Sequence, residues 1–178
     1  MTDAWHLRTL GDFALLRDGE VVRRFGSRRE DELLAFLAID ATVPKRRDEI
    51  AAAIWPGTPV AQARKHLSFN LFMLKKRFDA VGLADAIHAI GRGGLILDGR
   101  LVVDAQLFSA AAAAAGAADE PQRLDQALAL YGGPLMPTCA APWLEAPRAR
   151  YAALHELVTS RMSERVGVSA VHGAMAPQ

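Results

Sequence analysis

The most informative stretch of this chain reads Pro59-Val-Ala-Gln-Ala-Arg-Lys-His-Leu-Ser-Phe-Asn-Leu-Phe-Met-Leu-Lys-Lys-Arg-Phe78. Its apolar residues recur at helical spacing, which predicts one long amphipathic helix that Thr58 caps and Pro59 begins. We expect one stripe of this helix to face a core, and it consists of Val60, Leu67, Leu71, Leu74 and Phe78. The other face is basic and carries Arg64, Lys65, His66, Lys76 and Arg77.

A basic helix face with an apolar back suits a helix that docks into the groove of a polyanion. The same pattern also describes a solvated charged face, so the neighbouring segments have to decide between the two. A second helix is predicted over Arg46–Trp55, and Pro56-Gly57-Thr58 makes the turn between them. After the long helix, Ile87–Ile90 and Leu95–Leu97 flank a glycine-rich turn that carries Arg92, which predicts a β-hairpin.

The segments before this helix pair complete a familiar order of elements. Short strands are predicted over Trp5–Leu10, Phe13–Arg17 and Glu20–Arg23, with Asp18-Gly19 as a two-residue hairpin turn. Ser27 and Glu30 have the spacing of a capping box, which predicts a further helix to about Asp40. Strands, three helices and a terminal hairpin indicate an α+β winged helix-turn-helix over residues 1–100, with the long helix as its second, groove-entering helix.

The remaining residues, 101–178, change in texture and predict an all-α module. Helices are expected over Ala105–Ala115, Pro121–Tyr131 and Trp143–Val166, and Pro147 either kinks the last one or marks its true start. The small, weakly patterned residues Gly167–Gln178 predict a frayed tail.

Composition and charge narrow the classes of partner. Residues 1–100 hold 16 of the 21 Lys and Arg and 13 of the 20 Asp and Glu, so the N-terminal part is the better candidate for a negatively charged partner. The single cysteine, Cys139, excludes an internal disulfide. No apolar run is long enough to span a bilayer, and the N-terminus lacks a signal peptide's apolar segment, so we expect a cytoplasmic protein with no membrane partner.

Several ordered segments resemble bacterial SARP-type transcriptional regulators. In the N-terminal part these are Leu7–Phe13, Arg17–Val22, Ser27–Arg29, Ile50–Pro56 with its Ile-Trp-Pro ending, Ala63-Arg64 with Leu67, Leu71 and Leu74, and Gly93-Gly94. Val102–Asp104 with Phe108, Ala127–Leu135, Trp143–Glu145 and Arg148–Arg150 resemble the second module of that family, the bacterial transcriptional activator domain. The resemblance covers roughly residues 5–165.

The resemblance implies an OmpR-like winged helix fused to tetratricopeptide-like helices. It also implies binding to double-stranded promoter DNA, often as a homodimer on direct repeats, and contact with RNA polymerase. One departure is that the family's activator domain holds more helices than fit here. Because repeat helices bury their apolar faces on neighbours, either the chain is a fragment, or a dimer partner covers the open edge, or this is a short family member.

A second departure lies on the basic face itself. Phe69, Phe72 and Met73 project among Lys65, His66 and Lys76, where relatives usually carry polar or basic residues. Three interpretations stay open: apolar contact with thymine methyl groups, a protein interface, or packing under the hairpin.

No catalytic constellation is present in the sequence, and no cofactor or metal site is expected. The five histidines lack the spacing of metal ligands. Gly91-Arg92-Gly93-Gly94 lacks the Gly-Lys-Ser/Thr ending of a phosphate-binding loop. Cys139 has no histidine nearby in sequence, which indicates a buried or idle thiol.

The sequence therefore predicts a sequence-specific DNA-binding transcriptional regulator rather than an enzyme. We expect the DNA contacts to come from Arg64, Lys65, His66, Ser68, Lys75, Lys76, Arg77 and Arg92. Among them Arg64, His66 and Ser68 are the candidates for contacts at or near the bases. The alternative is a protein-interaction or dimerisation module, in which a degenerate winged helix no longer reads DNA and Phe69, Phe72 and Met73 bind a partner or a second copy.

Overall fold

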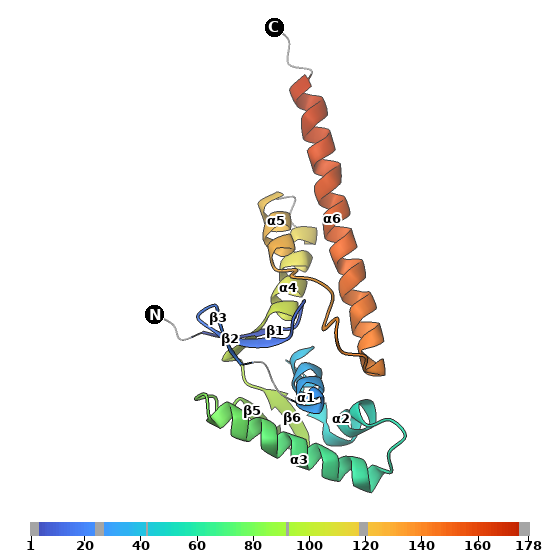
Figure 1. Ribbon diagram of the computed structural model, residues 1–178. Coiled ribbons are helices and arrows are strands. Elements are labelled where there is room, and N and C mark those ends of the chain that lie inside the picture. Colours follow the sequence, from blue (N-terminus) through green and yellow to red (C-terminus); the bar gives the residue numbers. More distant parts are fainter. Residues whose placement is uncertain (1–3, 24–26, 42, 92, 118–120, 175–178) are drawn as a thin grey trace.

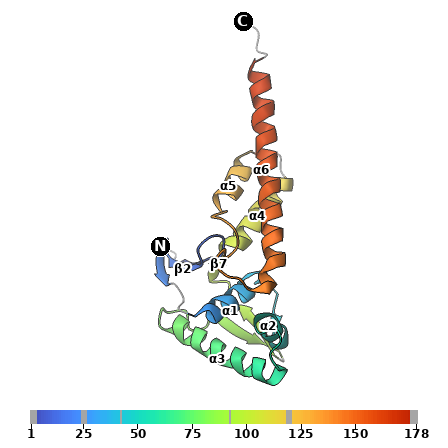
Figure 2. The ribbon, with the colours of Figure 1, turned by 45° about the vertical axis from the view of Figure 1, so that its right-hand side comes forward.

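The computed structural model describes residues 4–23, 27–41, 43–91, 93–117 and 121–174. It shows an elongated molecule of mixed α and β structure (Figure 1). Helix α3 (Val60–Asp79) forms one end, and helix α6 (Glu145–Ala174) runs away from it toward the other. A view turned by 45° shows the same order, with α4 and α5 stacked along α6 (Figure 2).

The N-terminal strands form an antiparallel meander, as the sequence predicts. Strands β1 (Trp5–Arg8), β2 (Ala14–Arg17) and β3 (Glu20–Arg23) pair in that order. Asp18 and Gly19 both have positive φ angles of 51° and 88°, the backbone that a type I′ hairpin turn requires. A fourth strand, β7 (Leu101–Val103), was not predicted and joins this sheet by parallel pairing with β1.

Three helices follow the meander. Helix α1 spans Arg28–Ala38, α2 spans Arg47–Ile54, and α3 begins one residue after Pro59. The predicted boundaries hold to within about two residues, but both predicted caps are wrong. The side chain of Ser27 makes no capping hydrogen bond to α1, and no side-chain cap of the kind predicted for Thr58 forms at the start of α3. Glu30 does not close a capping box, because it is buried and pairs with Arg77 of α3.

A second, three-stranded sheet has the order β4-β6-β5. Strands β5 (Ile87–Ile90) and β6 (Gly94–Leu97) form the predicted hairpin. The two-residue strand β4 (Lys45–Arg46) pairs with β6, so the hairpin lies against the start of α2. Gly91 and Gly93 have positive φ angles, which accounts for glycine in this tight turn.

From Asp104 onward, the regular elements of the described residues are all helices, and a non-helical segment over residues 130–141 separates two of them. Helix α4 spans Asp104–Ala117, α5 spans Pro121–Ala129, and a short 3₁₀ turn, η1 (Pro142–Leu144), leads into α6. Pro147 lies in the first turn of α6, where proline is tolerated, so it marks the start of the helix. The prediction of a frayed tail from Gly167 is wrong as far as Ala174, where α6 ends, and residues 175–178 lie outside the described residues.

One buried core joins the N-terminal strands to the C-terminal helices. Leu7, Leu10, Phe108, Leu135 and Tyr151 belong to the same cluster of buried residues. A smaller second cluster between α4, α5 and α6 is rich in alanine, which allows close helix packing.

Hydrogen bonds and one close backbone approach fix this junction. The carboxylate of Asp104 accepts hydrogen bonds from the backbone N–H groups of Thr9 and Leu10 at 2.8 and 2.9 Å, and from the Thr9 hydroxyl at 2.6 Å. Nearby, a Cβ added to Gly132 would lie 2.9 Å from the carbonyl oxygen of Leu10. Glycine is therefore required where the Gly132-Gly133 segment passes the end of β1.

Among the described residues, no helix combines the length and the hydropathy needed to cross a bilayer.

Candidate nucleic-acid interface

The inner face of α3 packs into the core as the apolar stripe predicts. Leu67, Leu71, Leu74 and Phe78 are buried against α1 and α2. Val60 is the exception, because its side chain is 64% exposed at the first residue of the helix. The long helix is thus anchored along one side only, and its opposite side is free to meet a partner.

The side of α3 that points away from the core forms a single row at i, i+3 and i+4 spacing, which we name the outer stripe. It consists of Gln62, Lys65, Phe69, Phe72 and Lys76, all exposed. Two lysines thus bracket two phenylalanines along the centre of the helix. The only carboxylate on α3 is Asp79, its last residue.

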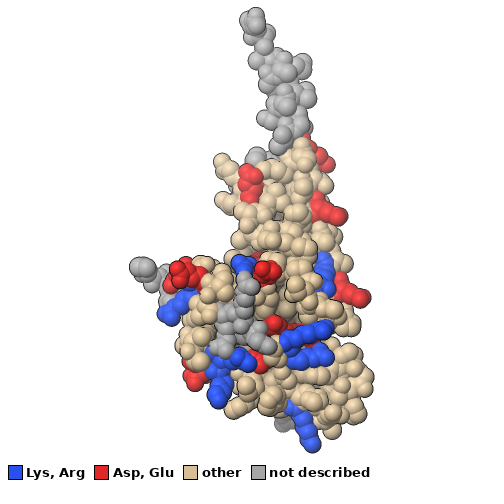
Figure 3. Space-filling view, in the orientation of Figure 1, with Lys and Arg blue, Asp and Glu red and all other residues tan. Residues whose placement is uncertain are grey.

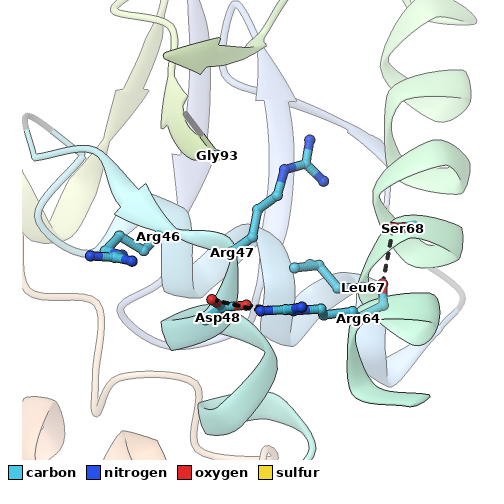
Figure 4. A pocket seen from close by; sticks show the side chains of 7 residues that line it. All are labelled: Arg46, Arg47, Asp48, Arg64, Leu67, Ser68 and Gly93. Atoms are coloured by element: carbon cyan, nitrogen blue, oxygen red, sulfur yellow. Dashed lines mark hydrogen bonds and ion pairs between the residues drawn. The ribbon is translucent and has the colours of Figure 1, made fainter. Parts of the chain in front are cut away.

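Beside the outer stripe lies a hollow of about 280 Å³ between α3, the start of α2 and the turn of the hairpin (Figure 4). We name it the basic hollow; its lining residues are Arg46, Arg47, Asp48, Arg64, Leu67, Ser68 and Gly93. Arg47 extends from the start of α2 into the space between Gly93 and α3. Its backbone N–H donates a hydrogen bond of 3.0 Å to the carbonyl oxygen of Gly93.

One ion pair crosses the floor of the basic hollow. The guanidinium of Arg64 donates two hydrogen bonds to the carboxylate of Asp48, at 2.7 and 3.0 Å. These bonds lower the pKa of Asp48 and raise that of Arg64. The side chains of Arg64 and Asp48 are 58% and 50% exposed, so solvent screens the ion pair. Arg64 can therefore exchange Asp48 for another anion at a small cost in free energy.

Two predicted contact residues lie on the opposite flank of α3, away from the basic hollow. The ring of His66 is half-buried and stacks on Trp55, with 5.9 Å between ring centroids. The guanidinium of Arg77 is directed into the protein and binds the buried carboxylate of Glu30 on α1. Arg77 therefore contributes to the packing of α3 on α1, which the sequence pattern had assigned to the exposed basic face.

Glu30 is part of an acidic run on α1 that is largely withdrawn from solvent. Its neighbour Glu32 is fully buried and accepts hydrogen bonds from Arg28 and Arg29 at 2.9 and 2.6 Å. Burial, followed by the charges of Glu30 and Glu32, raises the pKa of Asp31 to about 7. These carboxylates face the protein interior and leave the exposed side of α3 positively charged.

The structure places the predicted residues in three groups. Lys65 and Lys76 lie on the outer stripe; Arg64, Ser68 and the half-buried Lys75 follow on the flank of the basic hollow; and His66 and Arg77 lie on the other flank. Arg92 lies outside the described residues. The sequence analysis did not include Arg46 and Arg47 among the candidate contact residues. The signal that could have indicated them is the basic run Lys45-Arg46-Arg47, which directly precedes Asp48 and Glu49.

Figure 3 shows the distribution of charge over one face of the molecule. On this face the Lys and Arg side chains lie over the lower half, where the strands and α1 to α3 lie, with Asp and Glu side chains among them. The upper half, along α5 and α6, carries Asp and Glu among uncharged residues. Within the described residues, no group of three or more His, Cys, Asp or Glu side chains is arranged to hold a metal ion. Cys139 is buried, in agreement with the sequence.

A solved structure shares this arrangement. The chain superposes on Mycobacterium tuberculosis EmbR in complex with a low-affinity phosphopeptide, with a TM-score of 0.72 and 22% sequence identity. The match covers 90% of this chain and 44% of EmbR, so the chain spans less than half the length of that protein. No family model matches the chain, and the comparison with curated proteins found no match. At this identity the likeness shows the fold alone.

Proposed function

We propose that this protein is a sequence-specific DNA-binding transcriptional regulator, in which α2 and α3 form a helix-turn-helix and the β5–β6 hairpin is its wing. The observation that carries the proposal is the outer stripe of α3. Its lysines and exposed side chains lie opposite a buried stripe and beside a hollow lined by three arginines. A helix that is held from behind and cationic in front has the shape and charge needed to enter a major groove.

The cationic residues beside and along the outer stripe are proposed to position the helix on the phosphate backbone. Lys65 and Lys76 lie near the two ends of the outer stripe, where the helix meets the phosphates on either side of a groove. Arg46, Arg47 and Arg64 line the basic hollow at the start of α2, where the helix dipole also favours an anion. Ser68 and Lys75 extend the same flank, and Arg92 at the hairpin turn is a further candidate for a backbone or minor-groove contact. The inward position of Arg77 and the stacking of His66 argue against a direct DNA role for either.

The fold likeness supports the class of function but not its details. EmbR is a SARP-family transcriptional regulator, and this chain shares its fold over 44% of that protein. We propose residues 1–100 as the DNA-binding winged helix and residues 101–178 as the start of a tetratricopeptide-like activator module. Homodimers on repeated half-sites and contact with RNA polymerase are the further parts of this proposal.

Selection of bound duplexes from a random DNA pool tests the proposal. The expected result is an enriched motif, and a repeated motif at a spacing of one helical turn would support binding by two copies. Wild-type protein and a Lys65→Ala/Lys76→Ala variant should be compared on the enriched duplex and on an unrelated duplex of equal length. Failure to enrich any motif would overturn the proposal, and so would equal binding of the wild-type protein to the enriched and the unrelated duplex.

A further inference from the structure

The two phenylalanines of the outer stripe are the least expected feature of the candidate interface. The side chains of Phe69 and Phe72 are 63% and 62% exposed, among the most exposed large apolar side chains of the described residues. They are three residues apart, so they are neighbours on the helix surface. Lys65 precedes them on the stripe by one turn of helix, and Lys76 follows by one turn.

Their exposure excludes one of the three interpretations that the sequence left open. A side chain packed under the hairpin would be largely buried. Of the three apolar residues in question, Met73 alone is half-buried. Phe69 and Phe72 instead point away from the core stripe, and α3 needs neither of them for its packing on α1 and α2. Large apolar groups held in water on an otherwise charged face indicate a surface that is covered in the working complex.

We infer that Phe69 and Phe72 read the C5-methyl groups of thymine in the major groove. This inference rests on the proposed DNA-binding function and names the base chemistry that its central residues recognise. When a helix lies in the groove, the row that points farthest from the protein body lies deepest, so the centre of the outer stripe meets base edges while its ends meet phosphates. Aromatic side chains make apolar contact with the thymine methyl, which is the one apolar group on the major-groove edge.

Charge complementarity favours duplex DNA over a protein as the occupant of this surface. The outer stripe contains two lysines, with Asp79 one turn beyond Lys76 as the one carboxylate of α3, and the basic hollow beside it adds three arginines against one aspartate. A second copy of the same face would bring these like charges together, which is unfavourable. Duplex DNA matches the whole stripe. The phosphates along the groove edges are complementary to the lysines at its ends, and the thymine methyl groups on the groove floor are complementary to the phenylalanines at its centre.

Thymine-to-uracil replacement tests the inference because it removes one methyl group and leaves the hydrogen-bonding edge unchanged. The enriched duplex is synthesised with each thymine replaced singly by deoxyuridine, and binding of the full chain is measured at one salt concentration. We expect one or more replacements to weaken wild-type binding about fourfold each, the value for one buried methyl group. Phe69→Ala and Phe72→Ala should each bind the thymine duplex less tightly and lose sensitivity at particular positions.

Val60→Ala is the matched control, since it removes an exposed apolar side chain from the same helix but from outside the outer stripe. It should keep the full response to uracil. Specific binding that is equal on thymine and uracil duplexes would overturn the inference and leave the DNA-binding proposal intact, whereas absence of specific binding would overturn both. Sedimentation provides the remaining arm. If Phe69→Ala and Phe72→Ala convert a dimer to a monomer without changing the response to uracil, the surface is an interface between copies and the inference is wrong.

Discussion

The salt dependence of DNA binding follows from the number of cations that the structure presents to a groove. Six belong to the proposed contact set: Arg46, Arg47, Arg64, Lys65, Lys75 and Lys76. Each phosphate that is neutralised releases condensed counterions, and the slope of log affinity against log salt is about −0.9 per contact. A full set therefore gives a slope of about −5, which is roughly a thousandfold loss of affinity between 50 and 200 mM salt.

Lys65→Ala and Lys76→Ala are the informative perturbations because both side chains are exposed on the outer stripe and α3 carries a single carboxylate, Asp79, at its last residue. Each should reduce the steepness of the slope by about 0.9, and the double variant by about 1.8. Arg123→Ala removes the same charge from an exposed position on α5, at a distance from α3, and serves as the control.

Fluorescence anisotropy on one labelled duplex, measured at five or more salt concentrations, gives the slopes directly. Circular dichroism of each variant checks that the fold is retained. A wild-type slope near zero would refute the reasoning. So would a double variant with an unchanged slope, because the lysines of the outer stripe would then lie away from the phosphates.

Three further predictions concern stability, measured by urea unfolding. Asp31→Asn should stabilise the protein at pH 8 but not near pH 4. The folded state holds a proton on Asp31 up to about pH 7, so wild-type stability falls as pH rises from about 4 to 7. A difference in stability between variant and wild type that stays constant across this range would contradict the prediction. Gly132→Ala should destabilise by about 1–3 kcal/mol through its clash with the Leu10 carbonyl, whereas Gly99→Ala, with open space around its Cβ, should stay within about 0.5 kcal/mol. Asp104→Ala should cost about 2–4 kcal/mol because it leaves backbone N–H groups at the end of β1 unpaired, and an unchanged unfolding midpoint would argue against this role.

Local patterns predicted those parts of the fold whose causes are local. The stripe Leu67, Leu71, Leu74 and Phe78 has helical spacing and is buried, and the Asp18-Gly19 turn has the backbone that its sequence indicates. The hairpin over Ile87–Leu97 was predicted for the same reason, since its strands are adjacent in sequence and its turn is marked by glycine.

Features that depend on distant residues could not be predicted from one sequence. Strand β7 exists because Leu101–Val103 pair with β1, about 95 residues earlier in the chain, and nothing in three apolar residues specifies that partner. The placement of Arg77 depends on a buried carboxylate 47 residues away, and a helical wheel shows only that its position borders the basic face. Val60 shows the reverse error: its spacing placed it in the core, but it is exposed because the first residue of α3 extends beyond the core.

The acidic run of α1 explains why the outer stripe can be held in a fixed orientation. Glu30 binds Arg77 near the end of α3, and Arg29, itself paired with Glu32, donates a 2.7 Å hydrogen bond to the carbonyl oxygen of Ile54 at the end of α2. The oxygen of Glu32 also accepts a contact of 3.8 Å from the thiol of Cys139, in the loop that precedes α6. One helix therefore contacts both members of the proposed helix-turn-helix and the C-terminal part. Because these carboxylates are buried, any movement that separates them from their partners is costly, and α1 thereby links the position of α3 to α2 and to the loop that precedes α6.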